Sequence, residues 1–358
     1  MNNTTDSKWN FPYFYVTSMH LGMLFSVPLH IVAFWCIIYK TPSHSKQFSK
    51  ILLNLLFWSF TTEFTMSTAV TPILILPVPG YYAAGLFNLL NIPTICQGCI
   101  VFECMLITSV SICHIYYHRF INVLPEGSWI MKLYKPFRWF APGLAYIVIM
   151  TVPIIILYFT IPSDQEGAKN YIIALNCVSQ RLYDEPRMAV IPWDGYKAVL
   201  RFDWAVALAL LALCVVAGVV GILCLITFYY INKMSSKFVS PKTIRAQKVL
   251  YIAIVVQSLV HAFLFILPIF AIICILLFQI CLPGLNNVVL FILSYHCSCG
   301  TVTLLIMTPS YRKAIEIKLG YVFYIAKFKN RVRSISEPTN APRVSIRHLN
   351  VNVITMRG

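Results

Sequence analysis

Charged residues are scarce in this sequence: they occupy 11% of 358 positions, whereas about 25% is usual in a soluble domain. Acidic residues number only 12, against 28 Lys and Arg. Apolar residues reach 59% and the mean hydropathy is +0.74, so polar side chains are too few to cover a surface in water. This composition excludes a soluble enzyme, a secreted disulfide scaffold and a disordered chain.

Motifs of catalysis and of metal binding are missing as well. The sequence has no G-x-S-x-G turn, no H-E-x-x-H pair and no phosphate-binding loop. Its 12 cysteines are scattered through apolar stretches without a C-x-x-C pair in a loop, which argues against zinc fingers. The net charge of +16 would suit a nucleic-acid binder, but the basic residues form short runs between long apolar stretches. That pattern is typical of polytopic membrane proteins, so neither a nucleic-acid partner nor a cofactor is expected.

Seven apolar stretches are long enough to cross a bilayer as helices, since about 20 residues span roughly 30 Å of hydrocarbon. They cover Phe14–Tyr39, Ile51–Leu76, Leu86–Tyr116, Trp139–Ile161, Trp204–Ile231, Val249–Phe278 and Val288–Thr308. Prolines inside four of these stretches predict kinks, at Pro28, Pro93, Pro153 and Pro268. The sequence therefore predicts an all-α membrane protein, a seven-transmembrane helix bundle.

Basic residues orient the spans. The loops after the first, third and fifth spans carry three, four and five Lys or Arg, and the tail after Thr308 carries ten. The long loop at 161–203 carries five, which six acids offset. Because cytoplasmic segments hold the excess of Lys and Arg, the amino terminus is predicted outside and the carboxyl terminus inside.

A set of motifs follows in order along the chain: Pro28-Leu29-His30, Trp35–Pro42, LLNLLFWSFTTEF at 52–64, the turn at 77–85, FILSYHCSCGT at 291–301 and Pro309-Ser310-Tyr311-Arg312. Over residues 11–320 this set resembles the class H family of nematode serpentine chemoreceptors. The related class I shares several of the motifs, so it stays open as an alternative. Two features depart from the family pattern: Ser310 interrupts the closing Pro-Tyr-Arg element, and His118 stands where a receptor often has an acid before its arginine.

The resemblance implies a G-protein-coupled chemoreceptor that takes a small odorant or pheromone. Its implied partners are a heterotrimeric G protein and the lipid bilayer, at the plasma membrane and in the cilium of a sensory neuron. The expected parts are an extracellular segment 1–13, the receptor domain 14–308, an amphipathic juxtamembrane helix 309–330 and a disordered basic tail 331–358. Two overlapping sequons, at Asn2 and Asn3, predict one glycan or an unmodified stub outside the membrane.

Glu63 and Glu103 are the two carboxylates inside the predicted spans. A charge at mid-bilayer costs at least about 2.5 kcal/mol, so both are expected to face the bundle interior. Each is either a ligand-binding group or a protonated acid that holds two helices together. Glu103 lies seven residues below Cys96, about 10 Å along a helix, the depth of a pocket open to the outside.

A polar layer is predicted at mid-membrane. Glu63, His261 and His296 each lie 13 residues, about 20 Å, from a residue at the cytoplasmic edge. In a seven-helix bundle the second, sixth and seventh spans surround a common interior, so the three side chains are expected to meet or to be satisfied independently. A carboxylate beside an imidazole would provide two states for a switch.

Cys96 and Cys177 are predicted to form a disulfide that fixes the long external loop over the bundle, because Cys177 is the one cysteine of that loop. Cys99 and Cys281 are competing partners for it, and a free Cys177 is the remaining alternative.

Arg119 is predicted to couple the bundle to the G protein. It lies 23 residues, about 34 Å, from Cys96, where the third span leaves the hydrocarbon. With His118 beside it in place of a carboxylate, no local ion pair restrains it. A snorkelling membrane anchor is the alternative.

An enzyme remains the competing class of function. A seven-span zinc hydrolase would use Glu63, His261 and His296 around a metal-bound water. Hydrolases of the adiponectin-receptor type, however, place the amino terminus inside, opposite to the charge pattern here. His114 and His118 are spaced as a zinc-binding pair but have no evident third ligand, so no metal site is expected.

Overall fold

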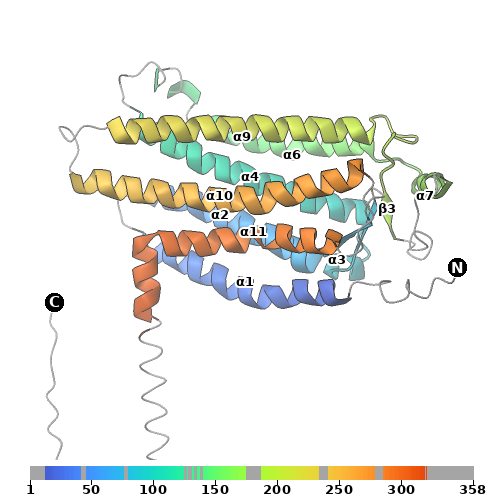
Figure 1. Ribbon diagram of the computed structural model, residues 1–358, viewed down its shortest axis with the longest axis horizontal. Coiled ribbons are helices and arrows are strands. Elements are labelled where there is room, and N and C mark those ends of the chain that lie inside the picture. Colours follow the sequence, from blue (N-terminus) through green and yellow to red (C-terminus); the bar gives the residue numbers. More distant parts are fainter. Residues whose placement is uncertain are drawn as a thin grey trace, which may run out of the picture. The chain divides into compact units, whose positions relative to one another are not determined.

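The computed structural model describes residues 13–41, 46–75, 80–124, 127, 131–132, 135–137, 140–174, 187–233, 241–278, 285–318 and 320. Long helices run side by side through it (Figure 1). The helices are α1 Tyr13–Lys40, α2 Lys46–Phe64, α3 Leu86–Leu89, α4 Thr94–Val123, α6 Phe140–Thr160, α7 Gln165–Ala174, α9 Phe202–Lys233, α10 Pro241–Leu277 and α11 Leu285–Met307. The bundle up to Arg312 is one compact unit, and the chain from Lys313 onward is a second.

Each of the seven predicted spans corresponds to one of the long helices. Six of these, all except α2, are long and apolar enough to cross a membrane: α1, α4, α6, α9, α10 and α11. α2 carries Lys46, Lys50 and Glu63, which dilute its apolar sequence. It nevertheless lies inside the bundle, packed against α1, α4 and α11. The predicted helix bundle is therefore confirmed.

Two of the predicted spans are not helical over their whole length. The second stretch was expected to remain helical to Leu76, but after α2 a π-helical turn ends at Ala69, and Thr71 adopts a positive φ of 46°. The third was expected to begin at Leu86, but α3 stops at Leu89 and α4 begins only after Pro93. Proline suits a helix start because it has no N–H to donate, so Pro93 begins a helix and does not kink one.

A small antiparallel sheet closes one end of the bundle and qualifies the all-α prediction. Its strands are β1 Pro72–Leu74, β2 Gly80–Ala83 and β3 Ala189–Val190, in the order β1-β2-β3. Ile73 is opposite Tyr82, and Tyr81 is opposite Ala189. Because β3 comes from the long 161–203 loop, backbone pairing fastens that loop to the connection between α2 and α4.

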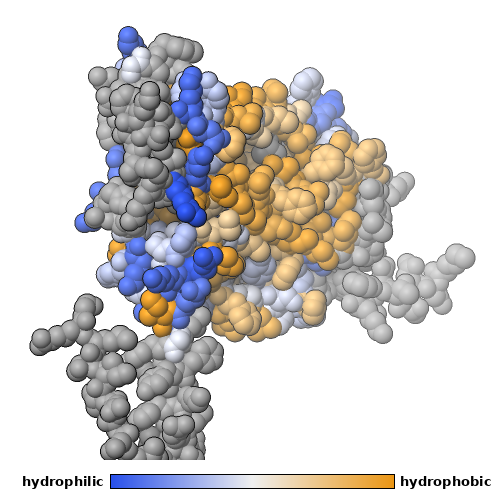
Figure 2. Space-filling view, turned by 60° about the vertical axis from the view of Figure 1, so that its left-hand side comes forward, coloured by the Kyte–Doolittle hydropathy of each residue, from blue (hydrophilic) through white to orange (hydrophobic). Residues whose placement is uncertain are grey.

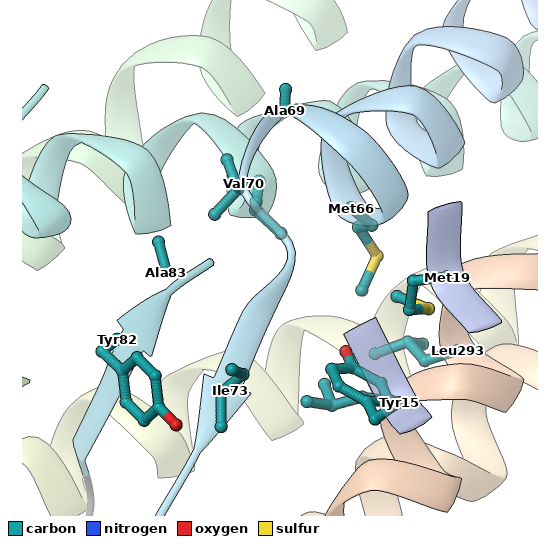
Figure 3. Close-up of a cluster of buried hydrophobic side chains, with 11 residues drawn as sticks. Tyr15, Met19, Met66, Ala69, Val70, Ile73, Tyr82, Ala83 and Leu293 are labelled. Carbon is teal, nitrogen blue, oxygen red and sulfur yellow. The ribbon is translucent and has the colours of Figure 1, made fainter. Parts of the chain in front are cut away.

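A buried cluster joins this sheet to the helices (Figure 3). Met19, Met66 and Leu293 pack beside Tyr15, each at most 4% exposed, and they come from α1, the π-helical turn and α11. The Tyr15 hydroxyl donates to the carbonyl of Pro72 at 3.0 Å. Burial of several large apolar side chains stabilises this end of the bundle, at about 1.5–3 kcal/mol for each.

The flank of the bundle that faces the viewer in Figure 2 is largely apolar. Hydrophilic side chains gather toward one end in the same view. Large apolar side chains stay exposed along α6 and α9, among them Ile155, Leu211 and Leu225. A soluble protein rarely exposes such a surface, whereas in hydrocarbon it faces a matching solvent. The chain is a multi-pass membrane protein.

Gly22 permits close packing of α1 against α11. A Cβ at this position would lie 1.6 Å from the Tyr295 hydroxyl, which donates to the Met19 carbonyl at 2.8 Å. We expect Gly22→Ala to displace the Tyr295 ring and to lower the midpoint of thermal unfolding in detergent. Overpacking of this kind lowers the free energy of unfolding by about 1–3 kcal/mol. Gly218→Ala on α9, where nothing lies within 4 Å, is the matched control. Equal midpoints for the two variants would contradict this packing role.

Candidate functional site

Glu63 is fully buried within the bundle, on the last turn of α2. Ser298 of α11 donates to its carboxylate, with Oγ 2.7 Å from Oε1 and 2.8 Å from Oε2. Ser298 Oγ also lies 3.1 Å from Ser26 Oγ of α1. The expectation that Glu63 faces the interior agrees with this position, and hydroxyl groups from two other helices surround it.

His30 is the histidine that this cluster contains. Its Nδ1 lies 3.0 Å from the carbonyl oxygen of Ser26, and its Nε2 lies 3.4 Å from Thr301 Oγ1. Because a carbonyl only accepts, we assign a proton to Nδ1. We name the set Ser26, His30, Glu63, Ser298 and Thr301 the α1–α2–α11 cluster.

His296 lies on α11 but makes other contacts. Its Nδ1 bonds the carbonyl of Leu293, its Nε2 is 3.3 Å from Cys297 Sγ, and its ring packs on Phe265 of α10. The side chain of His261 is outside the described residues, so the three-residue polar layer stays a prediction. Sequence reasoning missed Ser26 and Ser298. For Ser26 the sequence did contain a signal: it lies four residues before His30, so the two polar side chains share one face of the first helix.

A second polar group, also missed, joins α2, α4 and α6. The Asn54 amide donates to the Tyr146 hydroxyl at 2.7 Å and to Ser111 Oγ at 3.2 Å. The hydroxyl oxygens of Ser111 and Tyr146 are 2.9 Å apart and share a hydrogen bond. His114, one turn along α4, meets the Tyr146 ring edge-on. Buried groups satisfied in this way fix which faces of the helices meet.

Glu103 lies on α4, and its environment differs from that of Glu63. Both of its carboxylate oxygens are buried, and neither has a hydrogen-bond partner among the described residues. Buried polar atoms are satisfied in the great majority of cases, so an orphaned carboxylate needs an explanation. This side chain retains its full capacity to accept hydrogen bonds.

Arg119 lies near the carboxyl end of α4, against aromatic rings. Its Cζ is 3.7 Å from the centre of the Phe48 ring of α2, and Phe48 also stacks with His118. In the described part of the chain, Nε and Nη2 of Arg119 are buried without a hydrogen-bond partner. Nearby, Tyr311 and Thr41 share a hydrogen bond of 2.8 Å. The described contact of the arginine is thus a cation–π contact with Phe48, in place of an ion pair.

The opposite end of α4 is tied to the long loop. Thr94 Oγ1 donates to the carbonyl of Arg187, and Tyr81 donates to the carbonyl of Thr94. Arg187 in turn bonds Asn88 through Nη1 at 3.1 Å. These bonds and β3 fasten the loop beside the mouth of α4, which is the role predicted for a disulfide.

A capped helix stabilises the same loop. Asp164 precedes α7 and accepts from the N–H of Gly167 at 2.8 Å, as an N-cap does. Lys197 pairs with the same carboxylate at 2.9 Å. The Gly167 N–H first, and then Lys197, hold the pKa of Asp164 below its usual value.

The Cys96–Cys177 disulfide stays a prediction, since Cys177, like Asn2 and Asn3, lies outside the described residues. Cys96 is exposed near the start of α4, beside the point where Thr94 holds the loop. We expect peptide mapping without reduction to recover Cys96 linked to Cys177. Recovery of Cys177 alkylated as a free thiol, or linked to Cys99 or Cys281, would contradict the pairing.

Within the described ranges, no group of three or more His, Cys, Asp or Glu side chains lies close enough together to hold a metal ion.

The predicted juxtamembrane helix is described only in part: residues 309–318 are helical.

Comparison with known proteins identifies the family. Residues 10–321 match the family model described as serpentine type 7TM GPCR chemoreceptor Srh. The chain is also 25% identical over 297 residues to serpentine receptor class H-72 of Caenorhabditis elegans, covering 81% of each chain. Both the family and the relative are of class H and not of class I. Both are described as receptors and not as hydrolases. The chain belongs to the Srh family of serpentine seven-transmembrane chemoreceptors.

Proposed function

We propose that this chemoreceptor binds a small external chemical cue inside the helix bundle and signals to a heterotrimeric G protein. The observation that carries the proposal is the buried carboxylate of Glu103, whose two oxygens have no partner in the described part of the bundle. Seven residues, about 10 Å of helix, separate it from Cys96 at the outer end of α4. A cue that enters from outside reaches this depth.

The chemistry of Glu103 selects the cue. An ionised carboxylate only accepts hydrogen bonds, and a low dielectric strengthens its attraction to a cation. A protonated amine satisfies it best, and a neutral N–H or O–H donor satisfies it in part. Glu63, His261 and His296 form the deeper polar side of the proposed ligand-binding interior.

Arg119 and His118 form the proposed coupling surface. The guanidinium is held by a ring and not by a carboxylate, so a carbonyl or carboxylate of the G protein competes for it without first breaking an ion pair. A movement of α4 relative to α2 would separate Arg119 from Phe48 and expose it. Ligand and G protein thus act on the two ends of one helix.

The proposed topology puts the amino terminus outside, where Asn2 or Asn3 accepts a glycan, and the basic loops and tail inside. The location is the plasma membrane, in the cilium of a sensory neuron. A tag before Met1 is then stained on intact cells and a tag after Gly358 is not. The reverse pattern would contradict this topology.

Calcium imaging of cells that express the receptor, against a panel of small amines, alcohols and neutral odorants, tests the proposal. We expect an amine to give a response, and Glu103→Gln to raise its half-maximal concentration roughly 10- to 150-fold, since a hydrogen bond to a charged group contributes about 1.5–3 kcal/mol. Glu166→Gln, the same change at an exposed position of α7, is the matched control. Equal potency in the two variants would contradict the assignment of Glu103.

A further inference from the structure

A groove opens on the flank of the bundle between α1 and α11. Its volume is about 250 Å³, and no charged residue lines it. Its walls are Gly22, Phe25, Ser26 and Leu29 of α1 with Phe291, Tyr295 and Ser298 of α11. Phe25 is 80% exposed and Phe291 is 40% exposed, so the groove opens toward the hydrocarbon.

The lining of this groove is almost wholly apolar, but two of its residues, Ser26 and Ser298, belong to the α1–α2–α11 cluster. Ser298 lines the groove, and its hydroxyl contacts both oxygens of Glu63, at 2.7 and 2.8 Å. Glu63 itself is 0% exposed. Ser298 therefore connects a fully buried carboxylate to a cavity that faces the bilayer.

Hydroxyl protons are shared within the cluster. Ser298 donates to the carboxylate of Glu63, and its Oγ lies 3.1 Å from Ser26 Oγ, which carries a proton of its own. The Nδ1 proton of His30 goes to the Ser26 carbonyl. Since Ser298 donates inward, its oxygen has a lone pair left for a donor that enters the groove. Such a donor would strengthen the bond from Ser298 to Glu63, because hydrogen bonds in a chain polarise one another.

We propose that this groove binds a medium-chain aliphatic alcohol that reaches it from the bilayer. The alcohol hydroxyl donates to Ser298 Oγ, and the alkyl chain lies along Phe25, Leu29 and Phe291. The volume admits about eight heavy atoms at ~30 Å³ each, close to the nine of octanol, whose chain end extends out of the open groove.

Three properties of the groove select this ligand. A neutral head group crosses hydrocarbon at lower cost than an ammonium does. An alcohol hydroxyl donates to the remaining lone pair of Ser298 Oγ. A fatty acid anion has no proton to donate there and, like an ammonium, is costly to place in hydrocarbon. The site is on the lipid side of α1 and α11, so it depends neither on Glu103 nor on G-protein coupling.

Photolabelling of the full-length receptor in lipid vesicles tests the proposal. The probe is an octanol analogue with a diazirine on its alkyl chain, and 1-octanol, octane, octanoate and octylamine are the competitors. We expect labelled peptides from α1 and α11, protected by 1-octanol at a concentration at least tenfold below that of any other competitor.

Two variants address the site itself. Ser298→Ala removes the acceptor and should weaken 1-octanol protection about tenfold, whereas Thr303→Val removes a hydroxyl of α11 outside the groove and should not. Leu29→Trp leaves the cluster intact and fills the groove, and it should abolish the labelling even if Ser298→Ala impairs folding.

Labelling spread evenly over the exposed flanks and unchanged by Leu29→Trp would overturn the site, since it would reflect partition into lipid. Equal protection by octane, or stronger protection by octylamine or octanoate, would overturn the assignment of an alcohol.

Discussion

Arg119→Ala should abolish the response of the receptor to any active cue, and basal nucleotide exchange by the G protein, while surface amounts stay normal. The guanidinium carbon lies 3.7 Å from the centre of the Phe48 ring, near the carboxyl end of α4. A desolvated contact of this kind contributes about 2 kcal/mol. The arginine is therefore held in place, yet it keeps hydrogen-bond donors that the described residues do not use.

Arg119→Lys separates coupling from membrane anchoring. Lysine preserves the charge and snorkels as well as arginine does, but it lacks the planar fork that stacks on a ring and binds a carboxylate through two donors. We expect the lysine variant to lose at least tenfold in signalling, measured as nucleotide exchange in membranes with equal receptor amounts. Lys132→Ala, an exposed basic residue of the same predicted face, is the control. Normal signalling by Arg119→Lys would show that the charge alone matters and would favour the anchor.

Phe48→Leu should act in the opposite direction. Loss of the ring frees the guanidinium, and about 2 kcal/mol corresponds to a roughly 30-fold shift between restrained and free arginine. The expected result is raised basal nucleotide exchange without a cue. Basal exchange at or below that of the unaltered receptor would contradict a restraining role for Phe48.

The course of the helices could be predicted because hydrocarbon imposes one strong rule: a span needs about 20 apolar residues. The position where α2 ends and the position where α4 begins could not be predicted in this way. Composition stays apolar through Pro72–Leu74, so hydropathy does not distinguish the end of a membrane helix from a strand packed on it. The breaks come from the backbone at Thr71 and Asn91, whose positive φ angles leave no mark in an apolar count.

The candidate site was predictable to the extent that charge in a membrane is costly. Glu63, Glu103 and Arg119 were identified because each must face the interior or an interface. Their partners could not be found in this way. Serine and phenylalanine are common in membrane helices, and whether Ser298 meets Glu63, or Phe48 meets Arg119, depends on helix rotation, which packing decides.

Glu63 and Ser298 should be coupled energetically, and more strongly than Glu63 and His296. Ser298 contacts both carboxylate oxygens, whereas the described hydrogen bonds of His296 go to Leu293 and Cys297. A direct hydrogen bond to a charged group contributes about 1.5–3 kcal/mol, so the pair joined by two short O···O contacts is expected to have the larger coupling energy.

Two double-mutant cycles measure this difference, each read as the free energy of thermal unfolding in detergent and as basal nucleotide exchange. One combines Glu63→Gln with Ser298→Ala and the other combines Glu63→Gln with His296→Gln. We expect a coupling of about 1.5 kcal/mol or more in the first cycle and a smaller one in the second. The reverse order would show that the carboxylate acts with the imidazole at mid-membrane, and the bistable element of the receptor would then join α2 to His296. With the expected order, that element is the α1–α2–α11 cluster, because a change in the bonding of Ser298 alters three helices at once.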